Sequence, residues 1–206
     1  NVSKILKAFQ AVLIPGGFGT RGIEGMIIAC KYARENKLPY FGICLGMQIA
    51  IIEFSRNILN LKNANSTEFN KKTKYPVIGL VTEWKDASGK TEHRTENSNL
   101  GGTMRLGGQK CLIKKSSHSY KLYKKLTITE RHRHRYEVNP EYKKELISKG
   151  MDIVGTSLDG NLAEMIEIKK HPWFIGCQFH PEFTSNPRDG HPIFNDFIAK
   201  AIKIKR

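Results

Sequence analysis

The chain has 206 residues, 39% of them apolar, which is enough for one α/β domain with a hydrophobic core. No apolar run reaches the roughly 20 residues of a membrane span, which excludes a membrane protein with spanning helices. The four cysteines lack Cys-x-x-Cys pairing, so a reduced, cytoplasmic protein is favoured over a disulfide scaffold. The formal net charge of +15 is spread along the chain, with one dense cluster at residues 131–135, so we expect no nucleic-acid partner.

The first predicted strand, residues 11–14, is a short apolar run followed by the glycine-rich loop Gly16-Gly17-Phe18-Gly19. Residues 17–22 match the Gly-x-Gly-x-x-Gly fingerprint, but the next strand has no acid to hold a ribose, so we reject a dinucleotide site. These glycines instead let backbone N–H groups approach a reacting carbonyl. Residues 22–36 predict a helix whose core side carries Met26, Ile27, Cys30 and Ala33.

The next predicted strand, residues 39–43, ends at a sharp turn before an apolar helix over residues 45–54. Cys44 occupies this turn between Gly42 and Gly46, which is the cysteine form of the Gly-x-Ser-x-Gly nucleophile elbow. Glycine is required because a Cβ would collide with neighbouring backbone, and the helix start would favour the thiolate. A buried cysteine in a tight turn is the alternative, unless a base and an acid are found elsewhere.

The middle of the chain is less regular. Residues 61–75 predict a surface loop, residues 85–89 a turn, and residues 77–84, 110–114 and 127–138 predict strands. Residues 94–108 are rich in Gly, Ser and Asn and predict a loop without the Lys and Ser/Thr of a phosphate-binding P-loop. The candidate zinc ligands lack the paired spacing of a zinc site, so no metal site is predicted. These candidates are His118, His132, His134, Cys177 and His180.

The last third predicts a helix over residues 139–148, a hairpin of residues 153–158 and 162–168, and an apolar strand over residues 173–179. His180 ends that strand, and Glu182 follows two residues later, so both side chains face the same way in an extended segment. Pro181 keeps the segment from becoming helical. The pair supplies the base and the orienting acid that a nucleophilic thiol needs. Residues 191–203 predict a closing helix with an apolar side of Phe194, Phe197, Ile198 and Ile202.

Three motifs together resemble the signatures of the class I (triad) glutamine amidotransferases: residues 16–19, 42–48 and 178–183. Four longer motifs narrow the resemblance to the glutaminase domain of the CTP synthase family, over nearly all of the chain: residues 63–69, 100–107, 131–139 and 184–192. The resemblance implies a three-layer, flavodoxin-like α/β fold with a mainly parallel central sheet. It also implies that residues 1–206 are an N-terminally truncated glutamine amidotransferase domain, which lacks its first strand and helix and the synthase domain.

The resemblance also assigns site residues. Cys44, His180 and Glu182 are expected to form the catalytic triad, and the N–H groups of Gly17 and Leu45 to form the oxyanion hole. The residues expected to bind glutamine are Gly17, Leu45, Gln48, Glu68, Arg135 and Tyr136. Glu68 would bind the α-ammonium group, and Arg135 with Tyr136 the α-carboxylate, because a guanidinium matches a carboxylate bidentately. Without the resemblance, the polar members of this set would be ordinary surface or helix-flank residues.

The implied activity is hydrolysis of L-glutamine, with the ammonia passing to a synthase domain that aminates UTP to CTP in pyrimidine nucleotide biosynthesis. ATP and Mg²⁺ would act in that domain, GTP would be an allosteric activator acting through residues 94–108, and the full-length protein would be a homotetramer. Two alternatives remain: another triad enzyme, such as a γ-glutamyl hydrolase, and a nucleic-acid-binding module that uses residues 131–135. Activation by GTP favours the CTP synthase family, whereas salt-dependent RNA binding that survives Cys44→Ala favours the binding module.

Overall fold

The computed structural model describes residues 2–80, 83–85, 91–93 and 104–204. Its helices and strands, in chain order, are α1 (Val2–Leu6), β1 (Val12–Ile14), α2 (Ile23–Glu35), β2 (Tyr40–Ile43), α3 (Leu45–Asn57), β3 (Asn65–Ser66), β4 (Pro76–Leu80), β5 (Glu83–Lys85), β6 (Thr91–His93), β7 (Arg105–Ile113), α4 (His118–Tyr123), β8 (Thr127–His134), β9 (Tyr136–Val138), α5 (Lys143–Ser148), β10 (Met151–Ser157), β11 (Ala163–Ile168), β12 (Phe174–Cys177) and α6 (Pro192–Ile202). Two short 3₁₀ helices, η1 (Pro140–Tyr142) and η2 (Pro181–Phe183), complete the described elements.

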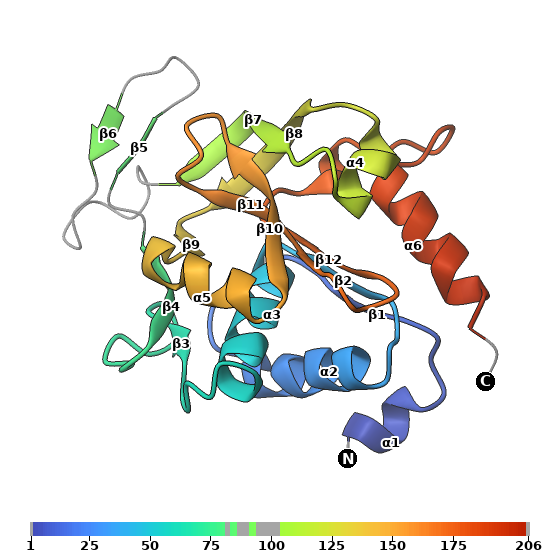
Figure 1. Cartoon of the computed structure of the whole chain (residues 1–206), viewed down its shortest axis with the longest axis horizontal. Coiled ribbons are helices and arrows are strands. Elements are labelled where there is room, and N and C mark those ends of the chain that lie inside the picture. Colours follow the sequence, from blue (N-terminus) through green and yellow to red (C-terminus); the bar gives the residue numbers. More distant parts are fainter. Residues whose placement is uncertain (1, 81–82, 86–90, 94–103, 205–206) are drawn as a thin grey trace.

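A seven-stranded sheet forms the centre of the molecule, in the order β1-β2-β12-β11-β10-β7-β8 (Figure 1). Strands β1, β2 and β12 are parallel to one another. Helix α2 connects β1 to β2 and returns the chain to the same end of the sheet, whereas β12 follows all the other strands of this sheet along the chain. The other four strands join by antiparallel pairings. The α/β class is therefore confirmed, but the expected mainly parallel sheet is wrong, since the antiparallel pairings outnumber the parallel ones.

Helices cover both faces of this sheet, as a three-layer fold requires. One apolar cluster joins α2, α3 and α5 to one face, with Ile27, Ile51 and Leu146 among its buried members. The second cluster joins α4 and α6 to the other face, around Phe41 and Phe197 (Figure 1). Since both of its faces are covered, β2 is buried at every residue, which is typical of a central parallel strand.

Two smaller sheets flank the centre. Strands β3, β4 and β9 form one of them, and β5 with β6 form a hairpin that projects from the body (Figure 1). The small sheet lies against α3, which is buried along almost its whole length, from Leu45 to Ser55. This packing brings the backbone of Tyr136, at the start of β9, next to the helix that follows Cys44.

Several predicted boundaries change. Strand β7 begins at Arg105, so residues 105–108 are strand and not loop, because they pair with β8 over its whole length. Residues 94–103 of the predicted loop, and residues 86–89 of the predicted turn, lie outside the described residues. On α6 the buried positions include Ile193 and Phe197, whereas Ile198 and Ile202 are 53% and 77% exposed, so the predicted apolar side was partly wrong.

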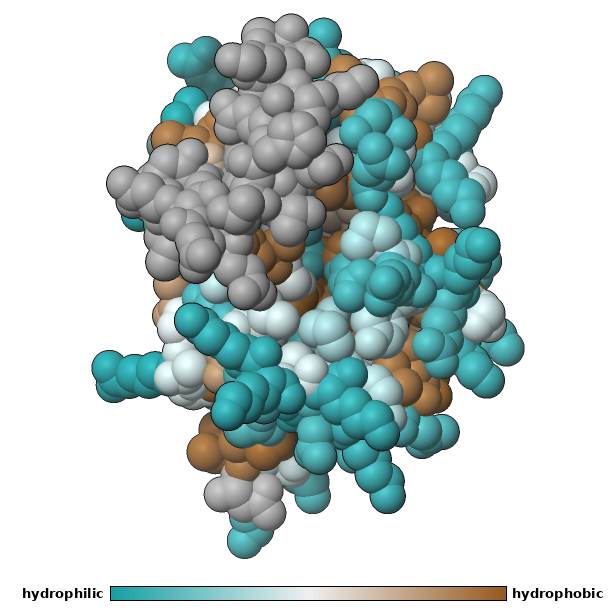
Figure 2. Space-filling view, turned by 90° about the vertical axis from the view of Figure 1, so that its left-hand side faces the viewer, coloured by the Kyte–Doolittle hydropathy of each residue, from teal (hydrophilic) through white to brown (hydrophobic). Residues whose placement is uncertain are grey.

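Hydrophilic side chains cover much of the face shown in Figure 2, with apolar side chains between them. None of the helices in the described ranges is both long enough and apolar enough to cross a membrane.

Candidate active site

Cys44 lies on the sharp turn between β2 and α3, with φ 50° and ψ −99°. A non-glycine residue at positive φ is strained, which is what the nucleophile elbow predicts. A Cβ added at Gly42 would lie 2.5 Å from the backbone carbon of Gly46, and one at Gly46 would lie 2.1 Å from the backbone oxygen of Ile14. The prediction that the elbow needs both glycines is therefore confirmed.

His180 reaches the same place from the neighbouring strand. Strand β12 pairs in parallel with β2, with Cys177 opposite Ile43, so Cys44 and His180 both follow the carboxyl ends of adjacent strands. A Cβ on Gly16 would lie 2.6 Å from Cε1 of His180 and 3.6 Å from Cβ of Cys44. The glycine-rich loop, the elbow and the histidine therefore enclose one small space.

Glu182 holds the ring of His180. Its Oε1 lies 2.6 Å from Nδ1 of His180, and the ring of Phe183 stacks on the imidazole at 5.1 Å between centroids. Burial raises the pKa of Glu182, but the hydrogen bonds from His180 and from its own N–H, together with the charges of His180 and His191, outweigh burial and hold that pKa below its usual value. The other ring nitrogen, Nε2, is buried and has no hydrogen-bond partner among the described residues. The segment forms the 3₁₀ helix η2, so the expectation that Pro181 prevents helical structure was wrong, although the contact it served is present.

The environment of the Cys44 sulfur is less favourable to a thiolate than the elbow alone implied. Burial above all, with the nearby carboxylates of Glu137, Glu182 and Glu68, raises the pKa of Cys44 to about 12, against the lowering effect of the Leu45 N–H. The expectation that the elbow lowers this pKa was therefore wrong. Burial also raises the pKa values of the three other cysteines, Cys30, Cys111 and Cys177. Geometry and not acidity therefore distinguishes Cys44.

Gly17 and Leu45 lie side by side at the mouth of the elbow. A Cβ on Gly17 would lie 3.2 Å from Cδ2 of Leu45, so a larger residue in the loop would press on the first residue of α3. The N–H of Leu45 is directed at the Cys44 sulfur, whose pKa it lowers. The structure thus brings together the two residues expected to supply oxyanion donors.

The expected glutamine-binding residues also converge on this region. Oε1 of Glu68 accepts a hydrogen bond from the N–H of Gly19 at 2.9 Å. Burial raises the pKa of Glu68, and the charge of Arg135 acts in the opposite direction. Glu68 also raises the pKa of Tyr136 and that of Cys44, after burial in both cases. Gln48 is 3% exposed and donates to the carbonyl of Tyr136 at 3.0 Å, so all these residues share one neighbourhood.

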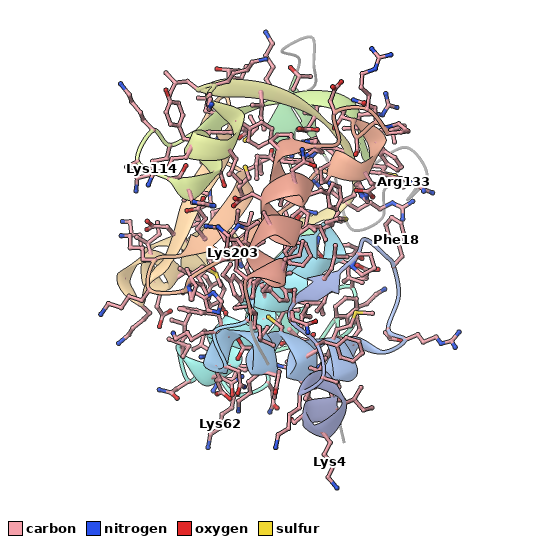
Figure 3. The ribbon with its side chains drawn as sticks, turned by 90° about the vertical axis from the view of Figure 1, so that its right-hand side faces the viewer. Lys4, Phe18, Lys62, Lys114, Arg133 and Lys203 are labelled. Carbon is pink, nitrogen blue, oxygen red and sulfur yellow. The ribbon has the colours of Figure 1, made fainter. Side chains whose placement is uncertain are left out.

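A surface cavity of about 430 Å³ opens beside the site, lined by Leu106, Arg131, His132, Arg133 and Phe183. The Arg133 guanidinium lies 5.8 Å from the centre of the Phe18 ring, and Figure 3 shows the two side chains extending to the same side of the molecule. Such a distance permits a cation–π contact. Sequence reasoning used Phe18 only as part of a glycine-rich loop, because nothing in its local pattern pairs it with Arg133.

A buried ionic cluster behind the site joins the central sheet to β9 of the small sheet, and sequence reasoning missed it. Nη1 of Arg105 lies 2.9 Å from Oε1 of Glu137 and 2.7 Å from Oε1 of Glu164, and all three side chains are at most 4% exposed. Nε2 of His134 lies 2.7 Å from the same Glu137 oxygen. The cluster joins β7, β8, β9 and β11, so no short motif could reveal it. Among the described residues, no group of three or more His, Cys, Asp or Glu could hold a metal ion.

The segment after Glu182 is anchored by another buried carboxylate, Glu130 of β8. It accepts hydrogen bonds from the hydroxyl groups of Tyr123 at 2.9 Å and Thr184 at 2.7 Å, and lies 2.9 Å from Nε2 of His191. The N–H of His180 itself donates to the carbonyl of the next β8 residue, Arg131, at 2.8 Å. Strand β8 therefore fixes both ends of the segment that carries His180 and Glu182.

The chain is similar to known proteins over most of its length. Residues 1–200 match the family described as glutamine amidotransferase class-I. The glutaminase domain of CTP synthase from Trypanosoma brucei, solved with bound acivicin, is 38% identical, with a TM-score of 0.87 over 99% of this chain and 75% of that one.

Two more distant structures share the fold. A putative GMP synthase subunit from Thermoplasma acidophilum has a TM-score of 0.57 at 17% identity, over 97% of this chain and 76% of that one. A glutamine amidotransferase from Thermotoga maritima has a TM-score of 0.51 at 12% identity, over 86% of this chain and 58% of that one.

Proposed function

This chain belongs to the class I glutamine amidotransferase family, and we propose that it is the glutaminase part of a CTP synthase, which hydrolyses L-glutamine through Cys44, His180 and Glu182. The observation that carries the proposal is the geometry at the ends of two adjacent parallel strands. A strained cysteine elbow follows one strand, and a histidine hydrogen-bonded to a glutamate at 2.6 Å follows the other. Nucleophile, base and orienting acid are the three parts that thiol-based acyl transfer needs.

The proposed reaction starts with transfer of the Cys44 thiol proton to Nε2 of His180, the buried nitrogen described above. The thiolate attacks the side-chain carbonyl carbon of glutamine, and the N–H groups of Gly17 and Leu45 stabilise the oxyanion. The imidazolium then protonates the departing nitrogen, which leaves as ammonia, and a γ-glutamyl thioester remains on Cys44. His180 next takes a proton from water, and the resulting attack on the thioester releases glutamate and restores the thiol.

Glu182 serves this cycle by holding the tautomer of His180. Because Nδ1 is bonded to the carboxylate, Nε2 is the nitrogen that exchanges protons with the sulfur and the leaving group. The depressed pKa of Glu182 keeps its carboxylate charged, so it also stabilises the imidazolium.

The substrate side of the proposal uses the residues gathered around the elbow. Glu68 would bind the α-ammonium group of glutamine, Arg135 and Tyr136 its α-carboxylate, and Gln48, Gly17 and Leu45 would contact its side chain. The opposite charges of Glu68 and Arg135 suit the two ends of an amino acid zwitterion, and their mutual electrostatic effect supports a shared pocket.

The finer assignment to CTP synthase rests on the 38% identity to the Trypanosoma brucei domain. In this proposal the ammonia aminates UTP in a separate synthase domain that uses ATP and Mg²⁺, GTP activates the glutaminase step, and the complete protein is a cytoplasmic homotetramer. The chain described here supplies no phosphate-binding loop of the Lys and Ser/Thr type, so we expect it alone to make no CTP from UTP, ATP, Mg²⁺ and ammonia.

The test is glutamate release from glutamine by the purified chain, by Cys44→Ala and by the matched control Cys111→Ala. Cys111 is as buried as Cys44 but lies in β7, so its loss should leave activity within about twofold, whereas Cys44→Ala should lose more than about 10³-fold. Equal loss in both variants, or none in either, would contradict the thiol mechanism. Addition of GTP separates the finer assignment: stimulation supports a CTP synthase, and an active but GTP-insensitive enzyme points to another amidotransferase or a γ-glutamyl hydrolase.

A further inference from the structure

Gln178 is a fully buried amide beside the nucleophile that the mechanism above does not use. It lies between β12 and His180, with its backbone N–H bonded to the carbonyl of Glu164 at 2.8 Å. Its side-chain Nε2 lies 3.6 Å from Sγ of Cys44, within the range of an N–H···S hydrogen bond. Its Oε1 accepts a hydrogen bond from Nε2 of Gln48 at 3.2 Å.

These contacts form a chain of hydrogen bonds with only one possible direction. Nε2 of Gln48 donates to the backbone carbonyl of Tyr136 at 3.0 Å, and a carbonyl can only accept. Gln48 must therefore present its NH₂ group to Tyr136, and the second hydrogen of that group faces Gln178. Gln178 must then present its oxygen to Gln48, which leaves its NH₂ group facing the sulfur. The backbone of β9 thus fixes a hydrogen-bond donor on Cys44 through two side chains.

The sulfur needs such a donor because its surroundings oppose negative charge. Three carboxylates, those of Glu137, Glu182 and Glu68, act on Cys44 electrostatically, and the site is buried. An N–H donor stabilises a thiolate, which accepts strongly, more than a thiol, which accepts weakly. A donor whose orientation is already fixed does this without reorganisation when the charge appears.

We propose that Gln178 stabilises the Cys44 thiolate by donating to its sulfur, and that Gln48 is the positioning residue that holds Gln178 in the donating orientation. This inference rests on the proposed function, since it gives both amides a role in forming the nucleophile. It also gives Gln48 a role separate from any contact with glutamine.

The test compares the rate at which iodoacetamide alkylates Cys44 between pH 6 and pH 10 in the wild-type chain, Gln178→Met and Gln109→Met. Methionine keeps the length of glutamine but lacks the donor. Loss of a hydrogen bond to the charged sulfur should lower the fraction of thiolate, and the greater intrinsic reactivity of a more basic thiolate offsets part of this loss. We therefore expect Gln178→Met to slow alkylation about 4- to 20-fold throughout the rising part of the profile. Gln109, a partly buried glutamine on β7, is the matched control and should leave the profile unchanged. The Cys44 peptide is followed by mass spectrometry.

A second variant and a wild-type measurement guard against misfolding. Gln48→Met frees the Gln178 amide to rotate and should slow alkylation by a smaller factor. In the wild-type chain, the side-chain amide resonance of Gln178 should shift with the same pH dependence as Cys44 alkylation. A Gln178→Met profile that coincides with wild type, or a Gln178 resonance that ignores the ionisation of Cys44, would overturn the inference.

The two proposals fail in different ways. If the wild-type chain hydrolyses glutamine but Gln178→Met alkylates normally, the role of Gln178 is wrong and the glutaminase assignment stands. If the wild-type chain does not hydrolyse glutamine but Gln178→Met shifts the alkylation profile, the glutaminase assignment is wrong and Gln178 still controls the acidity of Cys44.

Discussion

The parallel and antiparallel halves of the central sheet bury different chemistry. Strands β1, β2 and β12 contain no charged residue, and β2 and β12 are buried at every position. The antiparallel half buries charged or titratable side chains on most of its strands, including Arg105 on β7, Glu130 and His132 on β8, and Glu164 on β11. Cys44 and His180 follow the ends of β2 and β12 in the apolar half, and β12 borders the charged half.

The difference shows two ways to hold a site in place. In the parallel half, close backbone packing fixes the elbow, and the cost of a misplaced atom is steric. In the antiparallel half, Arg105 must meet Glu164 of β11 and Glu137 of the small sheet, which are 59 and 32 residues away along the chain, and the cost of a missing partner is electrostatic. Substitutions in each half should therefore fail for different physical reasons.

The largest effect should come from removing the cation of the charged half. Arg105→Met leaves the buried Glu164 carboxylate without its closest cation, so the free energy of unfolding should fall by about 3–5 kcal/mol at pH 7. Arg56→Met is the matched control, because its partner Glu24 is 69% exposed, and should cost about 1 kcal/mol or less. Urea unfolding measures both. Similar losses in the two variants would show that burial of the cluster adds nothing.

The apolar half should break when its backbone packing is disturbed. Gly46→Ala places a Cβ 2.1 Å from the carbonyl oxygen of Ile14 and should lower the free energy of unfolding by about 3 kcal/mol, with loss of glutaminase activity. In the charged half, the same change at Gly108 meets only Thr129 Cγ2 at 3.4 Å and should cost less than about 1 kcal/mol. The two unfolding curves decide this, and a fully stable Gly46→Ala would mean that the elbow can relax.

The charged half should also respond to pH through Glu164. Burial raises its pKa to about 7, against the lowering effect of Arg105. The folded chain therefore holds this proton more tightly than the unfolded chain, so the stabilisation is full below the unfolded carboxyl pKa and is lost as pH rises through about 7. Glu164→Gln lacks this loss, so relative to wild type it should gain on the order of 3 kcal/mol between pH 4.5 and pH 8. Glu141→Gln, at an exposed position, is the control for replacing a carboxylate with an amide.

The smallest effect should be a gain in the free energy of unfolding from a substitution in α2, one of the helices that cover the apolar half. Gly25 lies inside α2, and a Cβ there meets no atom within 4 Å. Gly25→Ala should raise the free energy of unfolding by about 0.5–1 kcal/mol, because alanine loses less backbone entropy in a helix. Thermal unfolding is sensitive enough to detect this change. A decrease in melting temperature would reveal a contact that the structure does not contain.

The same division explains what the sequence could predict. The elbow was predictable because Gly42, Cys44 and Gly46 are adjacent in the chain and their geometry is local. The contact between His180 and Glu182 was also local, although the proline before Glu182 begins a 3₁₀ turn and does not extend the strand. That β12 lies beside β2, and so brings His180 to Cys44, needed either the resemblance or the structure.

What the sequence could not predict depends on long-range pairing. Residues 105–108 look like a glycine-containing loop, and only their pairing with β8 makes them strand. Arg105, Glu137 and Glu164 each read as ordinary surface charges until the fold buries them together. The acidity of Cys44 was misjudged for the same reason, since the burial and the carboxylates that raise its pKa come from distant segments.

The free, buried cysteines can also report local opening of the fold through their rates of chemical modification. Cys30 lies in α2, Cys111 in the antiparallel half, and Cys44 and Cys177 at the end of the parallel half. A thiol reagent modifies Cys30, Cys111 and Cys177 only when the surrounding structure opens, so their labelling rates give local opening free energies without any introduced probe. Equal opening free energies at Cys111 and Cys177 would mean that the two halves unfold as one cooperative unit. Unequal values would identify the half of the sheet that opens first and therefore limits the stability of the Cys44 elbow.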